Sequence, residues 1–170
     1  LVDGLAMMRP SAERPRRQLP MVRMAEFLAP EAPDDDGPVR ALFVIAGNPL
    51  VVVPNAEGVR RGLARDDLFT VVHEHFLTDT ARYADLVLPA TTQIESVDVV
   101  PAWGHLWMGW NEPAIAPIGE SVSNTELHRR LATAMGFTPD VAPHLHDDDM
   151  TVLRATMPTV DVDALRHDGW

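Results

Sequence analysis

The sequence predicts an α/β fold: a Rossmann-like open parallel sheet with helices on both faces, plus irregular flanking segments. Three short apolar runs, at Ala41–Ala46, Phe69–His73 and Leu86–Leu88, support this prediction. The runs are almost continuously apolar rather than alternating, which is typical of strands covered on both faces in a parallel sheet. Helix-compatible segments separate the runs, as expected where helices connect parallel strands.

The chain of 170 residues is long enough for one α/β domain with flanking pieces. We expect a proline-rich approach segment at 1–38 and the α/β domain at 39–138. Residues 139–170 are expected to begin a following segment that belongs to another part of a longer protein. The chain starts at Leu1 and ends in mid-pattern at Trp170, so we expect a fragment of a longer polypeptide.

Composition argues against several classes of function. The formal net charge of -11 argues against nucleic acid or an anionic membrane as the main partner. The chain has no cysteine, which excludes a disulfide, a cysteine nucleophile and a thiolate-held iron–sulfur cluster within it. No apolar run approaches the roughly 20 residues that span a bilayer. We therefore predict no membrane segment in this chain and favour the cytoplasm as its location.

Local signals define the elements expected around the three strands. Asn55 and Ser123 are good N-caps for helices, and Gly136 is a good helix end. The expected helices cover Met21–Leu28, Ala56–Ala64, Thr125–Met135 and Asp149–Thr156, with a helical turn at Asp79–Tyr83. The stretch Thr91–Asn111 is expected to be irregular, and Pro113–Pro117 to form a short strand or extended piece.

Polar residues follow the first two apolar runs at once. Ligands sit at the carboxyl ends of the strands in an open α/β sheet. Gly47 allows the backbone to approach a ligand, and the Asn48 side chain can form hydrogen bonds to it. The second strand is expected at Phe69–Glu74. Glu74 is therefore an acidic residue at a strand end, where it can accept hydrogen bonds from ribose hydroxyls. Thr78 and Asp79 open a helical turn that favours an anion or a polar ligand edge, although simple capping explains Thr78 equally well.

Other catalytic arrangements are missing from the sequence. The loop after the first strand is Gly-Asn-Pro, so it lacks the dense glycine cradle of a phosphate-binding loop. There is no serine–histidine–aspartate set. Metal-ligand types cluster at His144, His146 and Asp147–Asp149, but their irregular spacing in a proline-flanked loop supports adventitious binding at most. We therefore predict no catalytic residue and no metal ligand in this chain.

Three segments together resemble the third domain of molybdopterin oxidoreductases. These are large molybdenum or tungsten enzymes that include formate dehydrogenases, nitrate reductases and dimethyl-sulfoxide reductases. The resemblance covers about Val39 to Phe137. The segments that carry it are Ala41–Pro49, the run Thr78–Ala81 followed by Tyr83–Ala90, and Ile118–Glu120 with Ser123-Asn124 opening a helix that ends in Met135-Gly136.

The resemblance implies a domain that binds one of two molybdopterin guanine dinucleotides by its guanosine diphosphate end and is inactive alone. By position, Gly47 and Asn48 would lie near the diphosphate, while Glu74 and Thr78 would meet the ribose or guanine. Asn124 stands where relatives often have aspartate and would contact the same dinucleotide. The metal ligand would come from other domains of the same polypeptide, and any iron–sulfur cluster from a missing N-terminal region.

One departure from the family pattern weakens an assignment to formate dehydrogenase. The stretch Gln93–Asp98 lacks the Glu-x-x-Gly-Thr pattern common in those enzymes, and Asp98 replaces it as a candidate cofactor-binding residue. Two alternatives stay open: a degenerate nucleotide-binding α/β module with a regulatory or assembly role, and the central domain of a thiamine-diphosphate enzyme. The substrate and the redox partner are not defined by these residues.

Overall fold

The computed structural model describes residues 19–31, 38–102 and 104–169. They fall into two compact units, with the boundary in the sequence between Ala90 and Thr91. The two units are described separately below. The Arg14–Arg17 cluster and the acidic run at Asp34–Asp36 lie outside the described residues.

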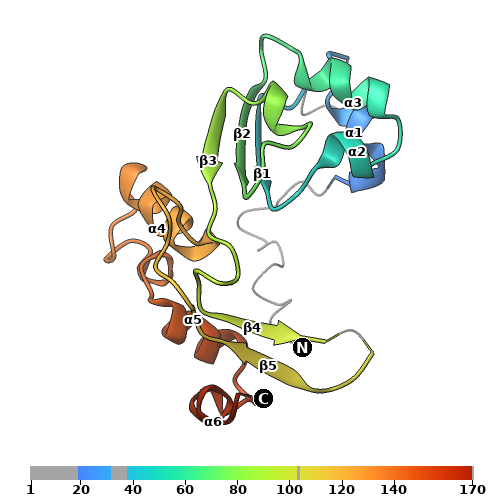
Figure 1. The fold of residues 1–170 in the computed structure, drawn as a ribbon. Coiled ribbons are helices and arrows are strands. Elements are labelled where there is room, and N and C mark those ends of the chain that lie inside the picture. The colour runs from blue at the N-terminus through green and yellow to red at the C-terminus, as the bar shows by residue number, and fades with distance from the viewer. Residues whose placement is uncertain (1–18, 32–37, 103, 170) are drawn as a thin grey trace. The chain divides into compact units, whose positions relative to one another are not determined.

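The first unit is a three-stranded parallel sheet with short helices, so the predicted α/β class is confirmed (Figure 1). The strands lie in the order β1-β2-β3. Strand β2 keeps the predicted bounds, and the predicted first helix is present as η2 and α1. The elements in chain order are η2 (Met21–Arg23), α1 (Met24–Phe27), β1 (Ala41–Ile45), α2 (Pro49–Val52), α3 (Ala56–Leu63), β2 (Phe69–Glu74), η3 (Ala81–Tyr83) and β3 (Leu86–Pro89).

The core of this unit lies between the sheet and its helices. Leu28, Val59 and Leu63 are almost fully buried where α1 and α3 meet, and Leu42 of β1 packs against this cluster. Val44 and Val72 form a second buried cluster together with Ala81 of η3. Burial of a side chain of this size contributes about 1.5–3 kcal/mol, so these contacts hold the strand ends in a fixed arrangement.

Helix α3 begins as its sequence predicts. Asn55 adopts a left-handed conformation with φ of 61°, which asparagine tolerates better than most residues. Its side-chain oxygen accepts a hydrogen bond of 3.1 Å from the Gly58 amide and so caps the helix. Helix α2 was not predicted: the Val51 and Val52 amides donate hydrogen bonds to the Asn48 carbonyl.

The second unit contains an antiparallel hairpin and several helices. The prediction of an irregular Thr91–Asn111 was wrong, because β4 pairs with β5 from Asp98↔Asn111 to Pro101↔Met108. At Pro113–Pro117, where a short strand or extended piece was expected, no strand forms. The described elements are β4 (Asp98–Pro101), β5 (Met108–Asn111), α4 (Asn124–Ala134), η4 (Pro143–Leu145), α5 (Asp149–Thr156) and α6 (Val162–Asp168).

Caps define the helices of this unit. Ser123 accepts a hydrogen bond of 3.2 Å from the Glu126 amide at the start of α4, and the chain leaves that helix at Gly136 with φ of 77°. Asp148 caps α5 in the same way, with 2.8 Å from its carboxylate to the Thr151 amide. The acidic run at Asp147–Asp149 is therefore a helix start, and not only the solvated loop that its charge suggests.

Candidate functional site

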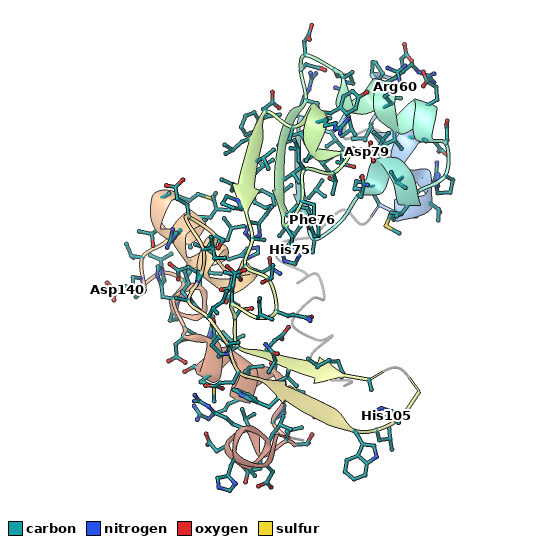
Figure 2. All side chains as sticks on the ribbon, in the orientation of Figure 1. Arg60, His75, Phe76, Asp79, His105 and Asp140 are labelled. Atoms are coloured by element: carbon teal, nitrogen blue, oxygen red, sulfur yellow. The ribbon has the colours of Figure 1, made fainter. Side chains whose placement is uncertain are left out.

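The candidate site lies at the carboxyl edge of the parallel sheet. Strand pairing aligns Ile45 with His73 and Glu74 with Pro89, so the three strands end close together. Figure 2 shows His75 and Phe76 at this end of β2. Within the first unit, the edge brings together the predicted site residues that leave β1 and β2: Gly47, Asn48, Glu74, Thr78 and Asp79.

Asn48 makes the most extensive contacts at this edge. Its Oδ1 accepts hydrogen bonds from the Thr80 amide at 3.2 Å and from the Thr80 hydroxyl at 2.8 Å. Thr80 Oγ1 in turn accepts from the Leu50 amide at 3.0 Å. Asn48 is half-buried and Thr80 is fully buried. These bonds join the end of β1 to the turn that follows β2.

Thr80 is a residue that sequence reasoning missed. It belongs to the Thr78–Ala81 run that carries the family resemblance, yet only Thr78 and Asp79 were named as candidates. A second threonine shortly after a predicted strand end was the available signal. Its partner, however, lies 32 residues earlier in the chain, and a contact of that separation leaves no local pattern.

Gly47 does not adopt the left-handed backbone conformation that a glycine at a strand end suggests. The left-handed backbone conformation falls on Ala46, with φ of 49°, and not on Gly47. A Cβ added at Gly47 would meet its nearest atoms, Ile45 O and Val44 Cγ1, at 3.7 and 3.8 Å, which is ordinary contact. The backbone amides of Gly47 and Asn48 donate to no other described residue. The end of β1 therefore offers hydrogen-bond donors to a ligand.

Glu74 and Thr78 supply acceptors at the end of β2. One carboxylate oxygen of half-buried Glu74 accepts from the His75 amide at 2.7 Å. The Thr78 hydroxyl accepts from the Ala81 amide at 3.2 Å, so it caps the turn that contains η3. Asp79 is exposed. Capping therefore occupies the Thr78 hydroxyl as an acceptor, while its proton remains available for a ligand.

Asp98 and Asn124 belong to the second unit. The exposed Asp98 carboxylate accepts a hydrogen bond of 2.8 Å from the Val99 amide at the start of β4. Asn124 is exposed and is the first residue of α4, directly after the Ser123 cap. Their predicted contact with the cofactor stays a prediction.

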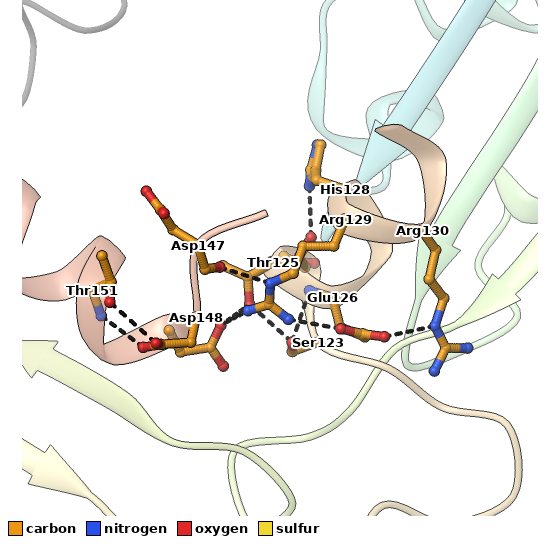
Figure 3. A network of polar contacts seen from close by, with 11 residues as sticks. Ser123, Thr125, Glu126, His128, Arg129, Arg130, Asp147, Asp148 and Thr151 are labelled. Carbon is orange, nitrogen blue, oxygen red and sulfur yellow. Dashed lines mark hydrogen bonds and ion pairs between the residues drawn. The ribbon is translucent and has the colours of Figure 1, made fainter. Parts of the chain in front are cut away.

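A polar network in the second unit joins α4 to α5 (Figure 3). Arg129 donates to the Asp147 carbonyl at 2.8 Å, to Glu126 at 2.7 Å, and to Asp149. The Thr125 hydroxyl also donates to Asp149, at 2.6 Å. The network ties the first turns of the two helices together, so it supports the segment that begins at Asn124.

Glu95 is a buried carboxylate of this unit, only 8% exposed, that accepts hydrogen bonds from two segments of the chain. It accepts hydrogen bonds from the Thr92 hydroxyl at 2.6 Å, the Thr92 amide at 2.8 Å and the Ile118 amide at 2.7 Å. These donors, the Thr92 hydroxyl first, hold the pKa of Glu95 below its usual range. The carboxylate thereby ties the stretch after β3 to the segment around Ile118.

The histidine and aspartate cluster does not form a metal centre in the described part of the chain. His146 Nε2 lies 2.6 Å from the Phe137 carbonyl, and His144 Nδ1 lies 3.8 Å from the Asp147 carboxylate. No group of three metal-ligand side chains is found among the described residues. No helix in the same part of the chain is long and apolar enough to span a membrane.

A parallel α/β sheet with polar residues at its strand ends defines a domain of the ligand-binding α/β class. Comparison of the chain with known proteins identifies its family within this class. A family model described as molybdopterin oxidoreductase matches residues 19–134. A probable oxidoreductase of Bacillus subtilis, YoaE, is 48% identical over 128 residues, which are 75% of this chain and 18% of that protein. The chain therefore belongs to the molybdopterin oxidoreductase family.

Two acetylene hydratases give further matches. The acetylene hydratase of Syntrophotalea acetylenica is 35% identical over 101 residues, or 59% of this chain and 14% of that protein. The solved structure of acetylene hydratase from Pelobacter acetylenicus superposes with a TM-score of 0.63 at 25% identity, covering 82% of this chain and 19% of that one. The chain thus spans about a fifth or less of the relatives it matches. Membership of the family implies a molybdenum or tungsten pterin cofactor.

Proposed function

We propose that this chain is the cofactor-binding domain of a bis-molybdopterin guanine dinucleotide oxidoreductase with molybdenum or tungsten. In this proposal the edge formed by β1 and β2 holds the guanosine diphosphate end of one cofactor. The observation that carries the proposal is the convergence of Gly47, Asn48 and Glu74 at the carboxyl ends of neighbouring parallel strands. Ligands of open α/β sheets bind at this position.

The donors and acceptors of this edge fit the chemistry of the proposed ligand. A diphosphate presents only acceptor oxygens, and the amides of Gly47 and Asn48 have no described partner. Ribose hydroxyls and the guanine N–H groups are donors, which suits the Glu74 carboxylate. A hydrogen bond to a charged group contributes roughly 1.5–3 kcal/mol, so two or three such contacts hold a dinucleotide without lysine or arginine.

The chain binds and orients the cofactor but does not supply the reaction. When bound, the metal–pterin group supplies the redox chemistry, and the surrounding protein sets its position and environment. In the proposal, Thr78 and Asp79 contact the nucleoside at the β2 end, and Asp98 and Asn124 are further candidate contacts of the cofactor. The metal ligand, any iron–sulfur cluster and the remaining domains come from other parts of the same polypeptide, and the proposed location is the cytoplasm.

The test is purification of the full-length gene product under native conditions, followed by metal analysis and acid hydrolysis. The proposal expects stoichiometric molybdenum or tungsten, with two equivalents of guanosine monophosphate released per metal. Folded protein that contains neither the metal nor the nucleotide would instead support a degenerate nucleotide-binding module with a regulatory or assembly role.

A further inference from the structure

The Asn48 side chain has a defined orientation at the carboxyl edge. The Thr80 backbone N–H can only donate, so the Asn48 atom 3.2 Å from it must be the amide oxygen. The Thr80 hydroxyl donates to the same oxygen at 2.8 Å. The choice between the two amide orientations is therefore made by the chemistry of the partner.

Thr80 has no alternative arrangement for its hydroxyl. It is fully buried, and its single proton goes to Asn48 Oδ1 while its oxygen accepts from the Leu50 amide at 3.0 Å. A hydroxyl has one donor and two acceptor lone pairs. The direction of the hydrogen bond between the two side chains is thus fixed by the Leu50 amide on the other side.

The two hydrogen bonds from Thr80 determine what the amide nitrogen of Asn48, Nδ2, can bind. Both bonds from Thr80 occupy the amide oxygen, and Nδ2 donates to no residue in the described part of the chain. Asn48 is half-buried, so this end of the side chain is still reachable by a ligand. The side chain therefore meets a ligand as a donor of two hydrogen bonds.

We propose that Thr80 is a positioning residue, which fixes Asn48 as a hydrogen-bond donor toward the diphosphate of the bound dinucleotide. This inference rests on the proposed function. It assigns Asn48 to the acceptor oxygens of the phosphates and excludes a role in reading the N–H groups of guanine. Donor-only recognition also predicts that a carboxylate at position 48 is rejected, because it can accept from Thr80 but places a negative charge against the phosphates.

The test uses Asn48→Asp in the full-length protein. Aspartate keeps the size of asparagine and an oxygen for the two Thr80 donors, so hydrogen exchange of the β1 and β2 amides should not change. Because this edge holds one of the two dinucleotides, the guanosine monophosphate released per folded protein should fall from the wild-type level toward half of it. Content at or above the wild-type level would show that Asn48 accepts from the ligand, and would overturn the inference.

Two variants at position 80 test the positioning role. Thr80→Val keeps the shape and removes the hydroxyl, whereas Thr80→Ser keeps the hydroxyl and removes the methyl group. We expect Thr80→Ser to keep the wild-type nucleotide content and Thr80→Val to fall toward half of it. Equal nucleotide content in the two variants would overturn the role of Thr80, and if Thr80→Val fails to fold, Asn48→Asp still decides the donor assignment. Wild-type protein without nucleotide would contradict the proposed function itself.

Discussion

Glu95 and Ile118 are joined by a hydrogen bond of 2.7 Å from the Ile118 amide to Glu95 Oε1, across 23 residues of the chain. Two bonds from Thr92 reach the other oxygen, at 2.6 and 2.8 Å. All three donors favour the ionised carboxylate, and they lower its pKa in the folded state below the ordinary value of 4.5. The link between these segments therefore depends on pH.

The sign of this dependence follows from the lowered pKa. A carboxylate whose pKa is lower in the folded state stabilises that state at all pH values above its unfolded pKa. This stability is lost as the pH falls through the folded pKa. We expect the Thr92 and Ile118 amides of the full-length protein to be protected at pH 7 and to lose protection below about pH 4.5. Hydrogen exchange, corrected for intrinsic rates, measures this change.

Glu95→Gln removes the charge of this carboxylate and so tests whether Glu95 causes the pH dependence. Glutamine has only one acceptor oxygen, so its amide nitrogen must face either the Thr92 donors or the Ile118 amide. Protection at one of these two positions should therefore already be reduced at pH 7, and it should depend little on acid. Equal acid dependence in wild-type protein and in the variant would show that another group controls this link.

Gly62 in α3 packs directly on Leu28. A Cβ added at Gly62 would overlap Leu28 Cβ and approach the Leu28 carbonyl oxygen to 3.1 Å. Alanine has the higher helix propensity, by about 1 kcal/mol, but overpacking costs typically 1–3 kcal/mol. The overlap with Leu28 Cβ is severe, so the cost lies in the upper part of that range. After the gain in propensity we expect Gly62→Ala to lower the free energy of unfolding of this unit by roughly 1–2 kcal/mol, measured by hydrogen exchange of the β1 and β2 amides.

Gly47→Ala is the control for this prediction. It adds the same methyl group at a position with ordinary contacts of 3.7 and 3.8 Å and no positive φ. Exchange in β1 and β2 should stay at the wild-type level. A stability loss in Gly47→Ala as large as that in Gly62→Ala would contradict the packing argument.

Much of the first unit could be predicted because its signals are local. Strand β2 was predicted with the bounds that it has, since a run of β-branched residues ends at a charged one. The Asn55 and Ser123 caps were predicted for the same reason. The hairpin of β4 and β5 was not predicted, because Pro101 and Gly109 weaken any strand pattern there. The Asn48–Thr80 contact depends on packing between distant segments, which local patterns do not carry.

Arg129 and Arg130 make a matched pair on α4. The Arg129 side chain forms polar contacts with Glu126, Asp149 and the Asp147 carbonyl and is 22% exposed. The Arg130 side chain is 64% exposed, and its one polar partner among the described residues is Glu126. Lysine cannot reproduce the planar set of donors that Arg129 uses. Arg129→Lys should weaken the contact between α4 and α5 by roughly 1–3 kcal/mol. Arg130→Lys should weaken it by less than about 1 kcal/mol.

Hydrogen exchange of the α5 amides measures this difference in the full-length protein. We expect faster exchange across Asp149–Thr156 in Arg129→Lys and wild-type rates in Arg130→Lys. If the two variants behave alike, the ion pairs of Arg129 contribute no more than those of an exposed arginine.

Glu74→Ala tests the acceptor at the end of β2. The variant removes a charged acceptor from the proposed nucleoside contact, which corresponds to roughly 1.5–3 kcal/mol of binding or about a 10- to 100-fold loss of affinity. Among the described residues the Glu74 side chain forms one hydrogen bond, to the neighbouring His75 amide, so folded stability should change little. Molybdenum or tungsten content per folded protein is the readout.

Glu57→Ala is a suitable comparison, since Glu57 lies on the surface of α3 and pairs with the exposed Arg60. It should leave the metal content at the wild-type level. Unchanged metal content in Glu74→Ala would contradict the role of Glu74.

The central claim is that the carboxyl edge of the β1–β2–β3 sheet binds the guanosine diphosphate end of the cofactor. An experimental structure of the natively purified full-length protein tests it most directly. We predict a diphosphate oxygen within about 3 Å of Asn48 Nδ2 and nucleoside donors within the same distance of the Glu74 carboxylate. A dinucleotide bound elsewhere, with Asn48 and Glu74 both free of ligand, would contradict the claim.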